Sequence, residues 1–214
     1  PYWKGRSLED QVREAVGPQV DAIAKVVKIN QKDHSQGHIC PNTKKWLRLG
    51  PAGIRNEAES HLAQADKKQH DFYNSVIIIM EGASAFMERY ATLAEKLYEE
   101  TKKENLKEAA RVCRKLSHSP AETYQEAVQA VWFLYVILQM EGNASSFSPG
   151  RMDQYLYPYY ERSVKEGMTL DDALELTECL WLKFNQLVYL RNSNSARYFA
   201  CFPIGFNVAI GGQK

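Results

Sequence analysis

The sequence has almost no excess of either charge, because 27 lysines and arginines face 26 aspartates and glutamates, a formal net charge of +1. Such a balance lacks the basic surplus that attracts nucleic acids and anionic membranes, so we expect neither as a partner. Long apolar runs are also missing. The longest uninterrupted one, from Ala130 to Leu138, is about half of what a bilayer requires, and no signal-peptide pattern is present.

Cysteines are few and show no metal-binding pattern. Cys40, Cys113, Cys179 and Cys201 are scattered without CxxC spacing. This argues against a zinc site and favours a reducing compartment, so we expect a cytoplasmic protein. The chain begins with Pro1 rather than Met, which suits a fragment or a processed chain.

Helical patterns fill most of the sequence. A capping box predicts a helix from Ser7 to about Val27, interrupted at Gly17. The pattern from Thr43 to Lys102 is again helical, with a break at Gly50 and Pro51. Mixed charges from Glu99 to Lys115 predict the solvent face of a helical hairpin.

The long segment from Asp71 to Thr101 is amphipathic. Apolar residues recur in it at three- and four-residue steps, which is typical of core packing rather than of a cofactor site. The residues of this stripe are Phe86, Met87, Tyr90, Leu93, Leu97 and Tyr98.

A very apolar helix follows. Ser119 and Pro120 predict its start, and from Ala127 to Met140 it is hydrophobic on every side. Such a helix is normally buried within a larger protein, so we expect its cover to be a sheet or another subunit. A further helix is predicted from a cap at Thr169 to about Leu190, with Trp181 and Phe184 directed inward.

The end of the chain resembles a strand. Residues 207–212 are typical of a short buried strand that ends in a turn, and a lone strand is not stable in water. The sequence therefore predicts a mainly α segment, residues 1–214, that forms part of a domain whose sheet lies elsewhere.

Between two apolar helices lies a loop of small and turn-forming residues, from Gly142 to Gly150, followed by Arg151, Asp153 and a group of tyrosines. The stretch SPGRMDQYLYPYY, from Ser148 to Tyr160, resembles the "GR-hydrophobic-DQY-x-YP" signature of glycyl radical enzymes, the pyruvate formate-lyase-like family. Three other stretches agree with this family in order: GHICP from Gly37, PAETYQEA from Pro120 and FPIGFNVAIGGQ from Phe202.

The resemblance implies a ten-stranded α/β barrel, of which this chain would be the N-terminal helical part with the first barrel strand near 207–212. Neither the radical cysteine loop nor the glycyl radical loop of the family is in the sequence, so no cofactor is expected to bind here and this segment alone should be inactive. The glycyl radical would be installed elsewhere in the full-length chain by a radical S-adenosylmethionine (SAM) activating enzyme. The expected partners are a small-molecule substrate, the rest of the barrel chain, this activase and a second copy in a homodimer.

The resemblance also implies a substrate site. His38 matches the histidine that contacts the leaving hydroxyl in diol dehydratases, and Ser146 matches a serine that holds the substrate. Ser145 stands where diol dehydratases carry a histidine, so we expect it to face the substrate without that contact. Phe202 and Phe206 are candidates for an apolar wall, although core packing explains them equally well.

These residues suggest a glycyl radical lyase that acts as a dehydratase, cleaving a C–O bond of a diol or hydroxy compound. The alternatives on the same scaffold are a C–S lyase of a sulfonate, a C–C lyase or decarboxylase of an arylacetate, and a fumarate-adding synthase. A non-catalytic, degenerate homologue is the remaining alternative.

Overall fold

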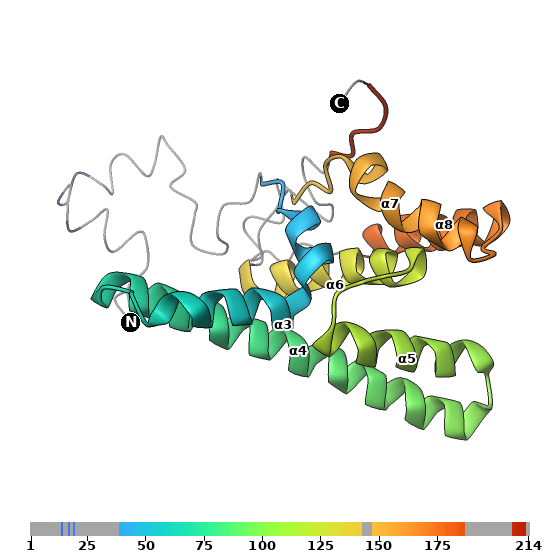
Figure 1. Ribbon diagram of the computed structural model, residues 1–214, viewed down its shortest axis with the longest axis horizontal. Helices are drawn as coiled ribbons and strands as arrows, with labels where there is room; N and C mark the ends of the chain where they lie inside the picture. Colours follow the sequence, from blue (N-terminus) through green and yellow to red (C-terminus); the bar gives the residue numbers. More distant parts are fainter. Residues whose placement is uncertain are drawn as a thin grey trace.

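A computed structural model describes residues 14, 17, 19, 39–142, 147–186 and 207–212, and this part of the chain is almost entirely helical (Figure 1). The helices are α3 (Thr43–Leu62), α4 (Lys67–Thr101), α5 (Glu104–His118), α6 (Tyr124–Gly142), α7 (Met152–Lys165) and α8 (Leu170–Phe184). The mainly α prediction is therefore confirmed. The predicted helix from Ser7 to Val27 falls outside the described residues, apart from three isolated positions.

Helix α3 is kinked where the sequence predicts a break. Gly50 has φ 61° and ψ 179°, and Pro51 follows it inside the helix. A methyl group on Gly50 would lie 3.2 Å from the carbonyl oxygen of Ser119. Glycine is thus required here both for its backbone conformation and for the close passage of the connection between α5 and α6.

Helices α4 and α5 form the predicted hairpin, whose turn projects away from the other helices while α3 packs against α4 (Figure 1). Helix α4 begins at Lys67 rather than near Asp71, because Asp66 and Gln69 make a capping box. The Asp66 carboxylate accepts from the Gln69 N–H at 2.9 Å, and the Gln69 side chain accepts from the Asp66 N–H at 3.0 Å. This reciprocal pair satisfies N–H groups that a helix start leaves free.

The apolar stripe of α4 is only partly core. Met87 is 1% exposed, as predicted, but Tyr90 and Leu93 are 47% and 48% exposed, so core packing is the wrong interpretation for them. Helices α3 and α5 pack against α4 but leave these two side chains exposed. Tyr90, like Phe86, still makes an edge-to-face contact with the ring of Phe133.

Helix α6 is the buried centre of the core, as its composition predicts, but helices of this chain, chiefly α3, α7 and α8, cover it rather than the expected sheet or second subunit. Ala127, Val131 and Tyr135 are fully buried, and the Trp46 indole of α3 donates a hydrogen bond to the Ala130 carbonyl at 2.8 Å. Met140, near the end of α6, is 57% exposed.

The start of α6 lies at Tyr124, later than the Ser119-Pro120 prediction. The cause is Glu126, whose carboxylate accepts hydrogen bonds from the backbone N–H groups of Glu122 at 2.9 Å and Thr123 at 3.2 Å. A carboxylate from inside the first turn therefore caps the helix, and the residues before Tyr124 stay non-helical.

Helices α7 and α8 pack on the opposite side of α6 from α4 (Figure 1). Thr169 and Asp172 form the predicted capping box of α8, and Phe184 is buried, with its ring 5.1 Å from that of Tyr135. The inward prediction for Trp181 is wrong, since it is 40% exposed and contacts Phe184 edge-on at the rim of a cavity. The predicted helix end near Leu190 is wrong, since α8 ends at Phe184 and a turn follows at Asn185 and Gln186.

With the other described parts of this chain, residues 207–212 form no strand ladder, and the barrel strand expected there, whose sheet would come from elsewhere, stays a prediction. Val208 makes one isolated bridge to Gly150, while Ile210 is 74% exposed. One bridging pair is not a strand ladder, because a ladder needs successive residues of two strands to pair with each other. Of the helices that the structure describes, none has the length and apolarity to cross a bilayer.

Candidate functional site

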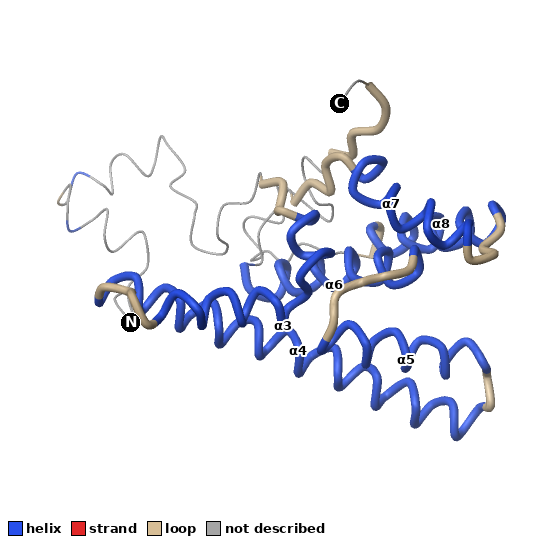
Figure 2. The backbone as a smooth tube through the Cα atoms, in the orientation of Figure 1, coloured by secondary structure: helices blue, strands red, loops and turns tan. Residues whose placement is uncertain are grey.

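Three segments that are distant in the sequence meet at one junction. Ile39 bridges Phe147 in parallel, and Gly150 bridges Val208 in parallel. The loop of residues 147–150 thus lies between the segment that leads into α3 and the segment near the end of the chain. In Figure 2 these segments appear as loops that gather beside the ends of α3 and α7.

Backbone hydrogen bonds fix this junction. The Ser148 N–H donates to the Ile39 carbonyl at 2.9 Å, the Gly150 N–H donates to the Asn207 carbonyl at 3.3 Å and the Ala209 N–H donates to the Gly150 carbonyl at 2.9 Å. The Ser148 hydroxyl oxygen in turn accepts from the Asn207 N–H at 3.1 Å. Ser148 therefore contacts both neighbouring segments at once.

Gly150 is the tightest point of the junction. Its φ is 69°, and a Cβ at this position would lie 2.5 Å from the sulfur of Cys40. A side chain at this position would force the Cys40 sulfur to move, so glycine is favoured by space as well as by backbone conformation.

Two tyrosines near Cys40 have hydroxyl groups shielded from water. Tyr135 of α6 is fully buried, and burial raises the pKa of its hydroxyl well above the ordinary value. Tyr155 of α7 is partly buried, and burial also raises the pKa of its hydroxyl. Both phenols stay neutral at physiological pH and can act only as neutral hydrogen-bonding groups.

Asp153 joins the start of α7 to the last described segment. Its carboxylate accepts from Nε of Arg151 at 3.2 Å and from the Gly211 N–H at 2.9 Å. The hydrogen bonds from Arg151 and Gly211 hold the pKa of Asp153 below its usual range, so the group is charged at neutral pH.

A cavity of about 310 Å³ opens next to the junction. It lies between α7, α8, the start of α6 and the 207–212 segment. Two of its lining residues, Tyr124 and Thr177, are joined by a hydrogen bond of 2.8 Å between their hydroxyl groups. Its lining is mostly aromatic and apolar: Tyr124, Met152, Asp153, Leu156, Tyr157, Tyr160, Thr177, Trp181, Val208 and Ile210.

The predicted site residues His38, Ser145, Ser146, Phe202 and Phe206 all lie outside the described residues. Three of them nevertheless directly precede junction residues in the chain. His38 is covalently joined to Ile39, Ser146 to Phe147 and Phe206 to Asn207. The structure thus brings together the described neighbours of three predicted residues.

The comparisons with known proteins agree with this arrangement. The family described as "Pyruvate formate lyase-like" matches residues 1–214. The chain belongs to this family of glycyl radical enzymes. A probable dehydratase of Escherichia coli, YbiW, is 31% identical over the whole chain, and an isethionate sulfite-lyase of Nitratidesulfovibrio vulgaris is 30% identical.

A solved glycyl radical enzyme has the same backbone arrangement. The glycerol-bound glycerol dehydratase from Clostridium butyricum superimposes with a TM-score of 0.88 at 32% identity, over 99% of this chain. The chain spans 28% of the length of that structure, and 28% and 29% of the lengths of YbiW and the sulfite-lyase.

Two contacts that hold the junction together were not predicted from the sequence: the hydrogen bond between Asp153 and Gly211 and the close approach of Cys40 to Gly150. Arg151 and Asp153 are part of the family signature, but their spacing gives no hint that the carboxylate reaches Gly211. The sequence likewise contains no sign that Cys40 lies against Gly150, because that contact joins positions far apart in the chain.

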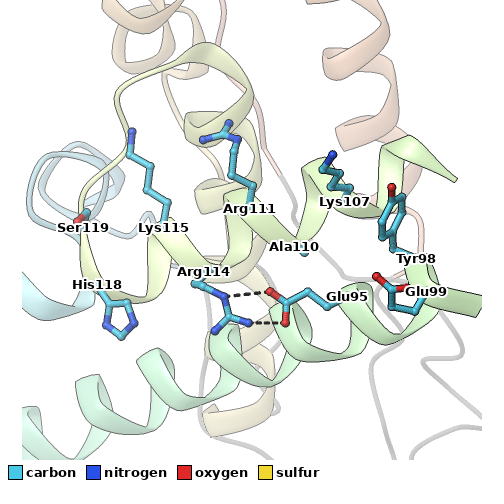
Figure 3. Close-up of a pocket in the computed structure, with 10 residues that line it drawn as sticks. All are labelled: Glu95, Tyr98, Glu99, Lys107, Ala110, Arg111, Arg114, Lys115, His118 and Ser119. Carbon is cyan, nitrogen blue, oxygen red and sulfur yellow. Dashed lines mark hydrogen bonds and ion pairs between the residues drawn. The ribbon is translucent and has the colours of Figure 1, made fainter. Parts of the chain in front are cut away.

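A second hollow, of about 450 Å³, lies between α4 and α5 (Figure 3). Its cations are already paired with glutamates. Arg114 donates to Glu95 at 2.7 Å, and Arg111 donates to Glu108 at 2.7 Å. The arginines of this hollow are therefore neutralised within the hairpin, and no residue of the junction lines it.

Proposed function

We propose that this chain supplies the substrate-binding wall of a glycyl radical lyase, with dehydration of a diol or hydroxy compound as the first candidate reaction. The proposal depends on one observation, the junction at Ile39, Phe147–Gly150 and Asn207. Two of these segments follow residues that the family resemblance assigns to substrate, His38 and Ser146, and the third follows Phe206, a candidate for the apolar wall of the site.

His38 is the proposed proton donor. After hydrogen is removed from a hydroxyl-bearing carbon, the neighbouring hydroxyl leaves as water only if it receives a proton, because hydroxide is a poor leaving group. An imidazole titrates near neutrality and suits this transfer. The hydrogen bond from the Ser148 N–H to the Ile39 carbonyl supports this role, because it holds the residue that directly follows His38 in the chain.

Ser146 is the proposed hydrogen-bond donor to the substrate, with Ser145 beside it. Because Ser145 replaces the histidine of the diol dehydratases, one polar contact is lost. Phe202 and Phe206 add apolar surface, and together these features favour a substrate larger or more hydrophobic than glycerol.

A sulfonate C–S lyase or an arylacetate decarboxylase is the second candidate. The relatives include the isethionate sulfite-lyase and an indoleacetate decarboxylase of Tractidigestivibacter scatoligenes, the latter 34% identical over 99% of this chain. The absent histidine at position 145 fits either reaction better than a glycerol dehydratase.

The radical chemistry belongs to residues outside this chain. The family's glycyl radical starts the reaction by hydrogen abstraction, and we propose that a radical SAM activase installs it. This chain's own residues then bind the substrate, orient it and donate the proton. A homodimer in an anaerobic cytoplasm is the proposed setting.

The test is anaerobic activation of the full-length protein, followed by electron paramagnetic resonance and product analysis with diols, hydroxy acids, sulfonates and arylacetates. A glycyl radical signal together with dehydration of a hydroxy compound is the expected result. Sulfite or carbon dioxide release would select the second candidate, and a protein that cannot be activated would overturn both.

A further inference from the structure

The carboxylate of Asp153 connects two of the segments that meet at the junction through a hydrogen bond. Asp153 lies in the first turn of α7, directly after the 147–150 loop, and accepts a hydrogen bond from the Gly211 N–H at 2.9 Å. It also accepts from Nε and Nη2 of Arg151, the N-cap residue, at 3.2 and 3.3 Å.

We propose that Asp153 is a positioning residue that holds the 207–211 segment against the 147–150 loop. In doing so it keeps these two described segments of the proposed substrate site beside each other. This inference rests on the proposed function, and it concerns how residues 147–150 and 207–211 are held beside each other.

The bridge between Gly150 and Val208 cannot do this alone. Its two hydrogen bonds both end on Gly150, and the third tie, from the Asn207 N–H to the Ser148 hydroxyl, lies before Val208, so the residues beyond Ala209 could still rotate away. Gly211 lies three residues beyond Val208, or about 10 Å along an extended chain. A second anchor at that distance prevents the rotation.

Arg151 fixes the carboxylate that makes the second anchor. Its guanidinium donates two hydrogen bonds, which orient both carboxylate oxygens and leave Oδ2 directed at Gly211. The Asp153 side chain is 31% exposed and that of Arg151 is 36% exposed. The two hydrogen bonds from Arg151, rather than burial, therefore fix the orientation of the Asp153 carboxylate toward Gly211.

A purely structural role is the competing explanation. An acidic residue in the first turn also stabilises its helix through the helix dipole, so loss of Asp153 could simply weaken α7. Only a readout specific to the 207–211 segment and to substrate can separate the two roles.

The experiment compares Asp153→Ala and Asp153→Asn with the control Glu161→Ala in the full-length protein. Glu161 lies on the same helix, is 51% exposed and pairs only with Lys165 at 3.6 Å among its described contacts. We expect amide hydrogen exchange of a peptide covering 207–212 to be at least about tenfold faster in Asp153→Ala, with α7 unchanged. Asp153→Asn keeps an acceptor oxygen for Gly211 and should lie between. The control should match the wild type.

Activity then tests the link to substrate. After activation, Asp153→Ala should retain its glycyl radical and its melting temperature but lose about 10- to 100-fold in kcat/KM, chiefly through KM. Unchanged exchange at 207–212 would overturn the inference, as would faster exchange with unchanged kcat/KM. If the wild type turns over no substrate, the proposed function fails, and the exchange result alone decides whether Asp153 holds the segment.

Discussion

A methyl group on Gly150 would lie 2.5 Å from the sulfur of Cys40, closer than any side-chain carbon can approach. Gly150→Ala should therefore destabilise the protein by about 2–4 kcal/mol, from the positive φ together with the steric clash. Urea unfolding measures the loss. Gly167→Ala is the matched control, since Gly167 also has a positive φ but nothing within 4 Å, and it should cost about 1 kcal/mol. Equal losses in the two variants would remove the Cys40 contact from the explanation.

The buried carboxylate of Glu126 should be important for stability. Its side chain is 1% exposed and pairs with Lys115 at 2.9 Å and Arg111 at 3.2 Å. Glu126→Gln should cost about 2–3 kcal/mol at pH 7, because hydrogen bonds from charged groups and from two backbone N–H groups are weakened. Glu122→Gln is the control, since Glu122 is an exposed partner of the same lysine and should cost less than about 1 kcal/mol.

The Glu126 effect should depend on pH. Burial alone would raise the pKa of this carboxyl, yet the hydrogen bonds from Lys115 and the backbone lower it below 4.5. The group therefore adds stability above about pH 4.5, where the unfolded chain is also ionised, and the contribution fades as the pH falls through the lower folded-state pKa. Unfolding curves from pH 7 to 3 should show the difference between wild type and Glu126→Gln shrinking at the acid end. A constant difference would contradict this account.

His38→Ala in the full-length protein should lower kcat by about a hundredfold or more while glycyl radical formation stays intact. The reason is the loss of the proton that the leaving hydroxyl needs. His118→Ala is a suitable control, because His118 is 70% exposed and contacts Glu88 on the far hairpin. Normal turnover in His38→Ala would remove this residue from the mechanism.

The 214-residue chain made alone should self-associate. Ile78 and Leu182 are each 67% exposed and Ile210 is 74% exposed, which is apolar surface that water disfavours. Light scattering should therefore detect aggregates, and Leu182→Lys with Ile210→Lys should reduce them. A chain that stays monomeric and unfolds cooperatively would instead favour the non-catalytic alternative.

Local patterns predicted the helices well, because capping boxes, glycine breaks and apolar periodicity act within a few residues. Thr169 and Asp172, the Gly50 kink and the buried α6 were all foreseen for this reason. The start of α6 was misplaced because the prediction followed Ser119 and Pro120, whereas Thr123 and Glu126 form a reciprocal capping pair four residues later. This spacing is a local signal, so the sequence did contain the correct start.

The candidate site divides in the same way. Motif resemblance selected His38 and Ser146, and the structure brings their described neighbours Ile39 and Phe147 together. The Asp153–Gly211 bond and the Cys40–Gly150 approach join segments more than fifty residues apart. Exposure of Tyr90 and Trp181 was missed for another reason: periodicity identifies the apolar face of a helix but not whether another element covers it.

The turn between α4 and α5 differs from the rest of the molecule. Lys102 has φ 55°, and it and Lys103 lie at the tip of the hairpin, far from the junction of loops (Figure 1). Length changes there would alter few tertiary contacts, so this tip is where evolution can insert residues, and where a fluorophore or affinity tag can be attached, without moving the proposed substrate site.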